Sequence, residues 1–264
     1  MRAPLPPSPF EGLTEDSPYG LLPAIGSNNL TPFDAYKKQL VVDVQKPIIA
    51  IGITGIGFSQ NLYSDVFERL SPHASVILSP YVSGVDAIQQ EARKQGYEVW
   101  LEMPLETKKF PYIDPGSKGI LANAGLKFNQ ENYKSILGMT SGYAGIVSYT
   151  DSAFANAKPM LNGILGDAFS RGLGFFELNP GRDSLSMKLA INSQSPIAVN
   201  SLRTKEQSIP DRFTAFKRLA KRNSRAIGVL ELNPALLANY QKELEKAQSE
   251  GFQIVPLSAA VDQF

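Results

Sequence analysis

Three apolar segments of this sequence each end in a glutamate. The runs WLE, FFE and VLE place Glu102, Glu177 and Glu231 directly after strongly apolar residues. A carboxylate in such a position loses hydration, so it needs a proton, a cation or hydrogen-bond donors. Three carboxylates in one pocket would suit sugar hydroxyls or a hard divalent cation such as Mg²⁺ or Ca²⁺. The alternative is structural: each glutamate caps the next helix or pairs with a lysine or arginine.

The residue inventory excludes several kinds of catalysis. Cysteine is absent, which rules out disulfides, thiolate metal ligands and a cysteine nucleophile. His73 is the one histidine, so a histidine-rich zinc site cannot be built. It precedes the second predicted strand, and we expect it in a surface loop at the end of the sheet away from the glutamates. Acid–base chemistry would therefore fall to Asp or Glu.

The elements that must position the glutamates alternate between strand and helix. From Lys46 onward, apolar runs of strand length alternate with amphipathic stretches of helix length. The strands are apolar throughout, which is typical of a parallel sheet covered on both faces. We therefore expect an α/β fold, either a parallel barrel or an open doubly wound sheet. The predicted strands are 47–53, 74–81, 97–104, 144–149, 173–178, 196–199, 226–232 and 252–257, and the predicted helices are 61–70, 84–95, 130–139, 159–170, 185–193, 211–222 and 234–250.

In both kinds of sheet, ligands bind at the carboxyl ends of the strands. The residues there form the predicted pocket. An irregular loop over 104–128 follows the third strand and should overhang it. Its Phe110 and Tyr112 either stack on a sugar ring or anchor the loop to the body. The strand-end residues are Thr54, Gly55, Glu102, Ser148, Tyr149, Glu177 and Glu231.

Residues 1–45 differ in composition from the rest. The segment is rich in Pro and Gly and shows no sustained period of 2 or 3.6, so we expect an extended arm or linker before a domain over 46–264. The alternative is an arm that packs on the domain or on a partner through Phe10, Tyr19 and Phe33.

Net charge and hydropathy exclude two further classes. With 26 Lys and Arg against 25 Asp and Glu, the net charge is +1, so binding of nucleic acid by bulk charge is not expected. No apolar run approaches the roughly 18 residues of a membrane span. No signal peptide is visible, so any export signal or anchor lies outside this sequence.

Several segments resemble the divergent polysaccharide deacetylases, bacterial envelope proteins with a NodB-like (β/α) barrel. The resemblance covers about residues 46–261, and EMPLE and YIDPG are its most specific parts. It implies a single barrel of seven or eight β/α units and a glycan ligand of the peptidoglycan type. Glu106 matches a glutamate of the family, so we expect it in the ligand pocket as well. The segments are KPIIAIGITGIGFS (46–59), GYEVWLEMPLET (96–107), FPYIDPG (110–116), GYAGIVSYTDSAF (142–154), RGLGFFEL (171–178), RAIGVLEL (225–232) and GFQIVPLSA (251–259).

The sequence departs from the family's catalytic pattern at the positions that matter most. Members that look catalytic carry an Asp pair where this chain has Thr54 and Gly55, and His where it has Glu102 and Glu231. They carry Asn-His where it has Ser148 and Tyr149, and Asp where it has Glu177. Metal-dependent deacetylation needs a cation to polarise the acetyl carbonyl and an acid–base group. We therefore expect no metal site of the usual kind, although a hard divalent cation on the carboxylates stays open.

Three hypotheses follow for function. The first is a deacetylase-like barrel that has lost catalysis and binds glycan or acts as a scaffold in the cell envelope. The second is an active carbohydrate hydrolase or deacetylase with an altered site built from Glu102, Glu177 and Glu231. The third is a protein-interaction module that engages an envelope partner through the arm and the 104–128 loop. The resemblance implies a periplasmic or envelope-associated location.

Overall fold

The computed structural model describes residues 3–59, 66–150, 154, 157–178, 184–201, 208–262 and 264. Its centre is a curled sheet of eight strands in the order β10-β3-β4-β5-β6-β7-β8, with β9 on the other edge of β3. The pairings between these strands are parallel, as the apolar strand runs predicted. The strands are β3 (Ile48–Thr54), β4 (Ser75–Leu78), β5 (Glu98–Glu102), β6 (Gly145–Ser148), β7 (Gly174–Glu177), β8 (Ile197–Val199), β9 (Arg225–Glu231) and β10 (Gln253–Val255).

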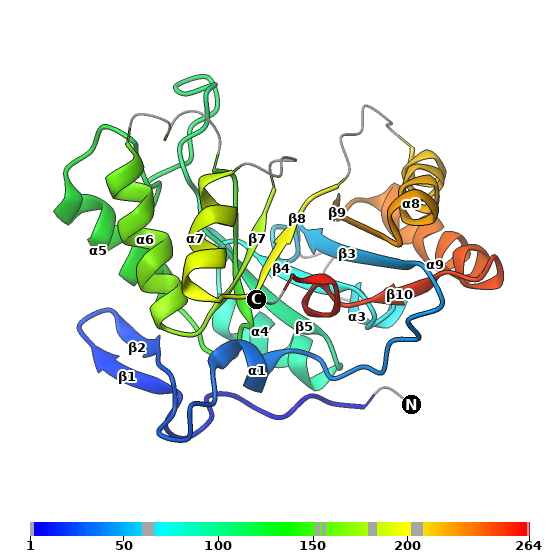
Figure 1. The fold of residues 1–264 in the computed structure, drawn as a ribbon, viewed down its shortest axis with the longest axis horizontal. Helices are drawn as coiled ribbons and strands as arrows, with labels where there is room; N and C mark the ends of the chain where they lie inside the picture. The colour runs from blue at the N-terminus through cyan, green and yellow to red at the C-terminus, as the bar shows by residue number, and fades with distance from the viewer. Residues whose placement is uncertain are drawn as a thin grey trace.

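Helices follow most of the strands and cover the outer face of the sheet (Figure 1). The fold is therefore the parallel α/β fold that the sequence predicted, of the NodB-like kind that the resemblance implied, and most of the helices lie where they were expected. One begins earlier, at Leu126 rather than residue 130, and residues 61–65 of the first predicted helix lie outside the described part. The helices are α3 (Val66–Arg69), α4 (Val85–Lys94), α5 (Leu126–Leu137), α6 (Lys158–Ser170), α7 (Leu185–Ser193), α8 (Ile209–Asn223) and α9 (Pro234–Ser249), with a short 3₁₀ helix η2 (Leu257–Ala260).

Two apolar layers explain why the strands are apolar on both faces. One cluster lies between the strands and the helices and includes Ile51, Leu101 and Phe175. A second cluster fills the inside of the curl, with Trp100 as its largest member, so the interior is a packed core rather than a channel. Successive side chains of a strand point to opposite faces. A strand residue that belongs to one cluster therefore shows that the residues directly before and after it point the other way. The second cluster takes Ala50, Ile77, Trp100, Val147, Phe176, Ala198, Ile227 and Val255 from the eight strands.

The gap between β8 and β9 is bridged by other segments. Among the described residues, β8 and β9 share no strand ladder. Instead Asp262 forms an antiparallel bridge with Ile197 of β8. Its carboxylate also forms an ion pair with Arg225 of β9, with 2.7 Å between the Arg225 nitrogen and the Asp262 oxygen. Further along, the backbone N–H of Ser201 donates to the carbonyl of Ile227 at 2.9 Å. These contacts close the curl into a barrel-like unit without an eighth strand pairing.

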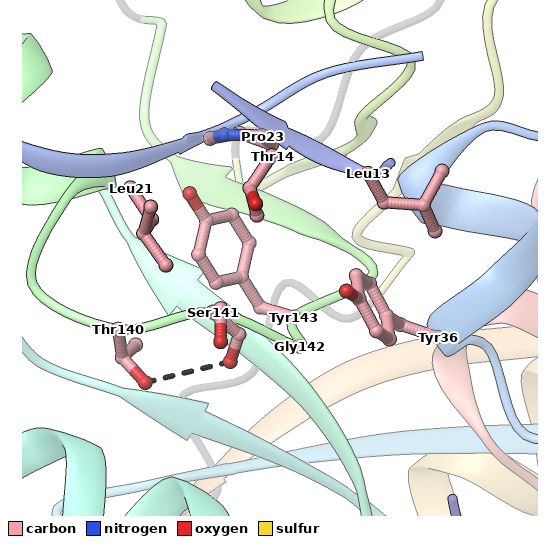
Figure 2. A pocket seen from close by; sticks show the side chains of 9 residues that line it. All are labelled: Leu13, Thr14, Leu21, Pro23, Tyr36, Thr140, Ser141, Gly142 and Tyr143. Atoms are coloured by element: carbon pink, nitrogen blue, oxygen red, sulfur yellow. Dashed lines mark hydrogen bonds between the residues drawn. The ribbon is translucent and has the colours of Figure 1, made fainter. Parts of the chain in front are cut away.

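The Pro-rich arm packs against the amino ends of the strands. It forms a hairpin of β1 (Thr14–Ser17) and β2 (Gly20–Pro23) and a short helix α1 (Pro32–Tyr36), and Figure 1 shows it at the end opposite to the long loop that precedes α5. Phe33 is buried and meets the ring of Trp100 edge-on at 6.3 Å. Figure 2 shows Leu21 of the hairpin beside Tyr143, across a small pocket. The structure thus matches the alternative of a packed arm; the division at residue 46 stays a prediction.

Arg93 of α4 fastens the arm to the barrel. Its Nε and Nη2 donate to the carbonyl of Pro6 at 3.0 and 2.8 Å, and its Nη1 donates to the carbonyls of Tyr36 and Gly142 at 3.2 and 3.1 Å. Burial lowers the pKa of Arg93 to about 10, so the guanidinium is still charged at neutral pH. One buried cation therefore joins two parts of the arm to the loop before β6.

Glu98 begins β5 and forms the centre of the closed end of the barrel, the amino ends of the strands that the arm covers. Its carboxylate is fully buried and accepts from Ser75 Oγ (2.8 Å), Trp100 Nε1 (2.7 Å), the N–H of Ser258 (3.1 Å) and the N–H of Lys38 (3.0 Å). The hydroxyl of Ser258 donates as well. The network joins the arm, two strands and η2, and it satisfies a buried charge with several donors at once.

In the described part of the chain, none of the helices combines the length and the apolarity that a bilayer crossing requires.

Candidate functional site

Glu102 ends β5 and faces the inside of the barrel. It shares this face with Glu98 and Trp100, because side chains two residues apart along a strand point the same way. Burial raises the pKa of Glu102 above its ordinary value, and a hydrogen bond from Ser79 opposes that rise only in part. The carboxylate is therefore half-buried at the open, carboxyl end of the barrel.

Two tyrosines accompany Glu102 at this end. Tyr81 follows β4 and Tyr149 follows β6, the two strands that flank β5. Burial raises the pKa of both phenols, and the negative charge of Glu102 raises each further. Tyr149 is 47% exposed, so its ring is available to a ligand.

Tyr81 also holds the long loop over the strand ends. Its hydroxyl donates to the carbonyl of Pro115 at 2.5 Å and accepts from the N–H of Lys118 at 3.1 Å. Gly116 lies against this hydroxyl: its φ is +86°, and a Cβ there would come within 2.7 Å of the Tyr81 oxygen. The loop is thus fixed by Tyr81 rather than by its own aromatic residues. Phe110 and Tyr112 remain exposed, Tyr112 to 95%.

Glu177 and Ser148 lie on the outer face, away from the interior. Glu177 follows Phe176, which points inward, so the Glu177 side chain points toward the helices. Its fully buried carboxylate accepts from the N–H of Thr150 at 3.1 Å, from the hydroxyl of Thr150, and from Ser186 Oγ of α7 at 2.8 Å. The hydroxyl of Ser148 donates to the carbonyl of Met103. Glu177 therefore ties the end of β7 to α7, and Ser148 ties the end of β6 to the residue after β5.

Glu231, Thr54 and Gly55 form a separate group. Thr54 pairs with Glu231 in the β3–β9 ladder, and a Cβ on Gly55 would lie 3.7 Å from Glu231 Cγ. The Glu231 side chain is exposed. Because β3 and β4 lie between β9 and β5, Glu231 is not a neighbour of Glu102 in the sheet. The structure thus places the three strand-end glutamates in three different surroundings.

The two remaining residues of interest, Glu106 and His73, lie at the base of the long loop and at the amino end of the barrel. Glu106 accepts from the N–H of Ala122 at 3.0 Å and so closes the base of the long loop. His73 lies at the start of β4, at the amino end of the barrel, as the sequence indicated. Burial and the charge of Lys38 lower its pKa.

The donor set does not fit a catalytic zinc. Such a site needs three protein ligands around one ion. The described residues contain no group of three or more His, Cys, Asp or Glu side chains that could hold a metal. The Glu177 carboxylate accepts hydrogen bonds from Thr150 and Ser186. Glu231 pairs with Thr54 in the β3–β9 ladder and is not a sheet neighbour of Glu102. We therefore derive no reaction step through a metal.

Sequence reasoning missed Ser79 and Tyr81. Both follow the apolar run SVIL in the segment SPY, and a polar residue and an aromatic residue at the carboxyl end of a buried strand were the available signal. Glu98 was missed because it begins a strand rather than ends one.

Comparison with known proteins agrees with this architecture. The sequence matches the divergent polysaccharide deacetylase family over residues 51–261. An uncharacterized protein from Agrobacterium tumefaciens has a TM-score of 0.83 and 27% identity, over 91% of this chain and 99% of its own. The catalytic domain of a peptidoglycan N-acetylglucosamine deacetylase from Eubacterium rectale has a TM-score of 0.53 and 12% identity, over 85% and 94% of the two chains, and shares the fold alone. A search of curated proteins found no match.

The parallel α/β architecture and the family match together define the class: a deacetylase-like protein. The chain belongs to the divergent polysaccharide deacetylase family, since the family match spans most of its length.

Proposed function

We propose that this protein binds a polysaccharide of the cell envelope at the carboxyl end of its barrel and does not deacetylate it. The observation that supports this is the grouping of Glu102 with Tyr81 and Tyr149 beside a firmly held loop that exposes Phe110 and Tyr112. Sugar rings offer apolar C–H faces to aromatic rings and hydroxyls to polar groups. The exposed ring of Tyr149 and the carboxylate of Glu102 offer these two kinds of surface at the ends of neighbouring strands.

The loss of catalysis rests on the donors themselves. Members of the family that look catalytic use imidazoles and an Asp pair, whereas this chain has Glu102, Glu231, Thr54 and Gly55 at those positions. A hydrolase built from carboxylates would need two of them on either side of one bond. Glu177 points to the helices, and Glu231 ends β9, which β3 and β4 separate from β5, so neither is a sheet neighbour of Glu102. Envelope localisation is part of the proposal, on family grounds.

The test is calorimetric titration with oligomers of N-acetylglucosamine and with glycan strands released from peptidoglycan. We expect binding by the wild-type chain and a loss of roughly tenfold in affinity for Tyr149→Ala, about the contribution of one ring contact. Phe264→Ala is the matched control, because Phe264 is also 47% exposed but lies by Gly172 at the opposite end.

Two outcomes would contradict the proposal. One is equal loss of affinity in Tyr149→Ala and Phe264→Ala, which would move the site elsewhere. The other is acetate release from acetylated oligomers by protein that carries one zinc per molecule.

A further inference from the structure

Basic side chains gather where three adjacent strands begin, at the amino end of the barrel. Lys46 lies just before β3, and the last turn of α8, which leads into β9, carries Lys221 and Arg222. Because β3 pairs with both β9 and β10, the starts of these strands lie side by side. Figure 1 shows α8, α9 and β10 on the side of the molecule away from α5 and α7. These cations therefore share one region of the surface.

The cations of α8 and α9 meet around the first residue before β10. Lys221 Nζ lies over the ring of Phe252, 5.6 Å from its centroid. Lys217, one turn earlier in α8, forms an ion pair with Glu250 at 2.9 Å. The hydrogen bond from Lys217 lowers the pKa of Glu250, and the charges of Lys246 and Lys221 lower it further. One carboxylate thus lies among three lysines.

The segment that leads into β3 is held against the same place. The N–H of Asp43 donates to Gln253 Oε1 at 2.9 Å, and Gln253 Nε2 donates to the carbonyl of Asp43 at 2.7 Å. The Asp43 carboxylate lies 3.6 Å from Lys46 Nζ. The backbone around Asp43 is therefore fixed to the start of β10.

Two valines flank Asp43 and project into solvent. Val41 is 96% exposed and Val44 is 87% exposed. Val41 also lines a shallow groove together with Lys46 and Phe252, which places the valines beside the cations. Exposed apolar side chains that adjoin polar groups in this way are typical of a surface that contacts a partner. We call this surface, made of Val41, Val44, Lys46, Lys221 and Arg222, the basic face.

An anionic lipid bilayer has the chemistry that matches both parts of the basic face. Each Lys or Arg near an anionic bilayer strengthens attachment about fivefold. Aliphatic side chains gain by entering the boundary between the headgroups and the acyl chains. An acidic peptide would pair with the cations but leave the projecting Val41 and Val44 in water. The combination of projecting valines and surrounding cations therefore favours a lipid surface.

We propose that the basic face docks this protein onto a membrane that carries anionic lipids. The valines enter the headgroup region, and Lys46, Lys221 and Arg222 contact the lipid phosphates. Because the basic face lies at the amino ends of the strands, docking turns the carboxyl end of the barrel away from the bilayer. The docking is independent of glycan binding, which takes place at that other end.

The experiment is sedimentation of the full chain with vesicles that contain no glycan. One set consists of phosphatidylglycerol and phosphatidylcholine in equal amounts, and the other of phosphatidylcholine alone. We expect the wild-type chain to bind the anionic vesicles at least roughly tenfold more tightly than the neutral ones. This comparison depends on no variant.

Two double variants then test the two parts of the basic face. In Lys221→Gln/Arg222→Gln we expect a loss of roughly tenfold or more in affinity for the anionic vesicles. In Val41→Ser/Val44→Ser, which leaves the charge unchanged, we expect a loss of roughly tenfold. All four side chains are exposed, so the fold should be unaffected. Lys127→Gln/Lys188→Gln is the control: it removes the same charge from exposed positions on α5 and α7 and should bind within about twofold of the wild-type chain.

The results divide clearly. Equal binding of the wild-type chain to the two kinds of vesicle, or binding to neither, overturns the proposal. Equal losses in the control and in Lys221→Gln/Arg222→Gln would mean that overall charge decides, which also overturns it. Unchanged binding in Val41→Ser/Val44→Ser would show that the basic face recognises negative charge alone, as an acidic peptide offers, and would overturn the assignment to lipid.

Discussion

Glu98 and Glu102 lie on the same face of the same strand, at opposite ends of β5. At the amino end, Glu98 is fully buried and has donors from Ser75, Trp100, Ser258 and Lys38. At the carboxyl end, Glu102 has Ser79 and two tyrosines, and burial raises its pKa. The arm and η2 supply the donors at one end, and nothing comparable covers the other end in the described part of the chain. One end is built for stability, and the other keeps a charge that is not fully compensated, as binding sites commonly do.

The largest expected effect is at the closed end. Glu98→Ala leaves Ser75, Trp100 and two backbone groups without an acceptor, and we expect it to lower the free energy of unfolding by about 3–5 kcal/mol. Urea unfolding measures the loss. Glu245→Ala on the surface of α9 should change it by less than about 0.5 kcal/mol. A loss below about 1 kcal/mol in Glu98→Ala would show that the network adds little to stability.

The next effect concerns the attachment of the arm. Arg93→Met removes the hydrogen bonds to Pro6, Tyr36 and Gly142, and we expect a loss of about 2–3 kcal/mol. Limited proteolysis should then cut residues 3–12 faster than in the wild-type chain. Lys94→Met, one residue further along α4 and exposed, is the control. Equal cleavage rates in both variants would mean that the apolar contacts of Phe33 hold the arm without Arg93.

The smallest effect is at the open end, and it has the opposite sign. Because burial raises the pKa of Glu102 from its ordinary value of 4.5, folding favours the protonated carboxyl over the ionised one. Its contribution to stability is complete below the unfolded pKa and is lost as the pH rises through the folded pKa. Glu102→Gln cannot ionise, so we expect it to be more stable than the wild-type chain at neutral pH, by less than the losses above.

Thermal unfolding across the pH range measures this difference. The gain should shrink as the pH falls from the folded pKa toward 4.5 and be small below 4.5, where the wild-type carboxyl is protonated in both states. A Glu102→Gln chain that is less stable at neutral pH would show that the Glu102 carboxylate is well compensated, and the contrast with Glu98 would then disappear.

Much of the fold could be predicted from local patterns. Apolar runs and amphipathic stretches gave the alternation of strand and helix from Lys46 onward and the parallel sheet. The start of α5 was missed because its first turn has a weak apolar pattern. There Asn129 is buried through hydrogen bonds with the backbone of Leu121, at 2.9 and 2.8 Å, and no periodicity reveals such a pair.

The candidate site could be predicted only in part. The structure has Glu102 at the end of β5 and Tyr149 directly after β6, as the predicted strand ends required, and the long loop follows β5. Glu177 was placed in the pocket, but the structure directs it to Ser186 of α7. In a strand that is apolar on both faces, the sequence does not show which face points into the barrel. The sequence therefore could not tell whether the last residue of such a strand, here Glu177, faces the interior or the helices.

By itself, the sequence determined the class of fold, the absence of thiols, the presence of a single imidazole, and the presence of carboxylates at three strand ends. The tertiary structure alone decided that those carboxylates have separate surroundings, that Tyr81 joins Glu102, and that the arm and η2 enclose Glu98. The reason is physical: composition and periodicity follow from local backbone geometry, whereas the partners of a buried charge come from segments far apart in the chain, such as Lys38 and Ser258 around Glu98.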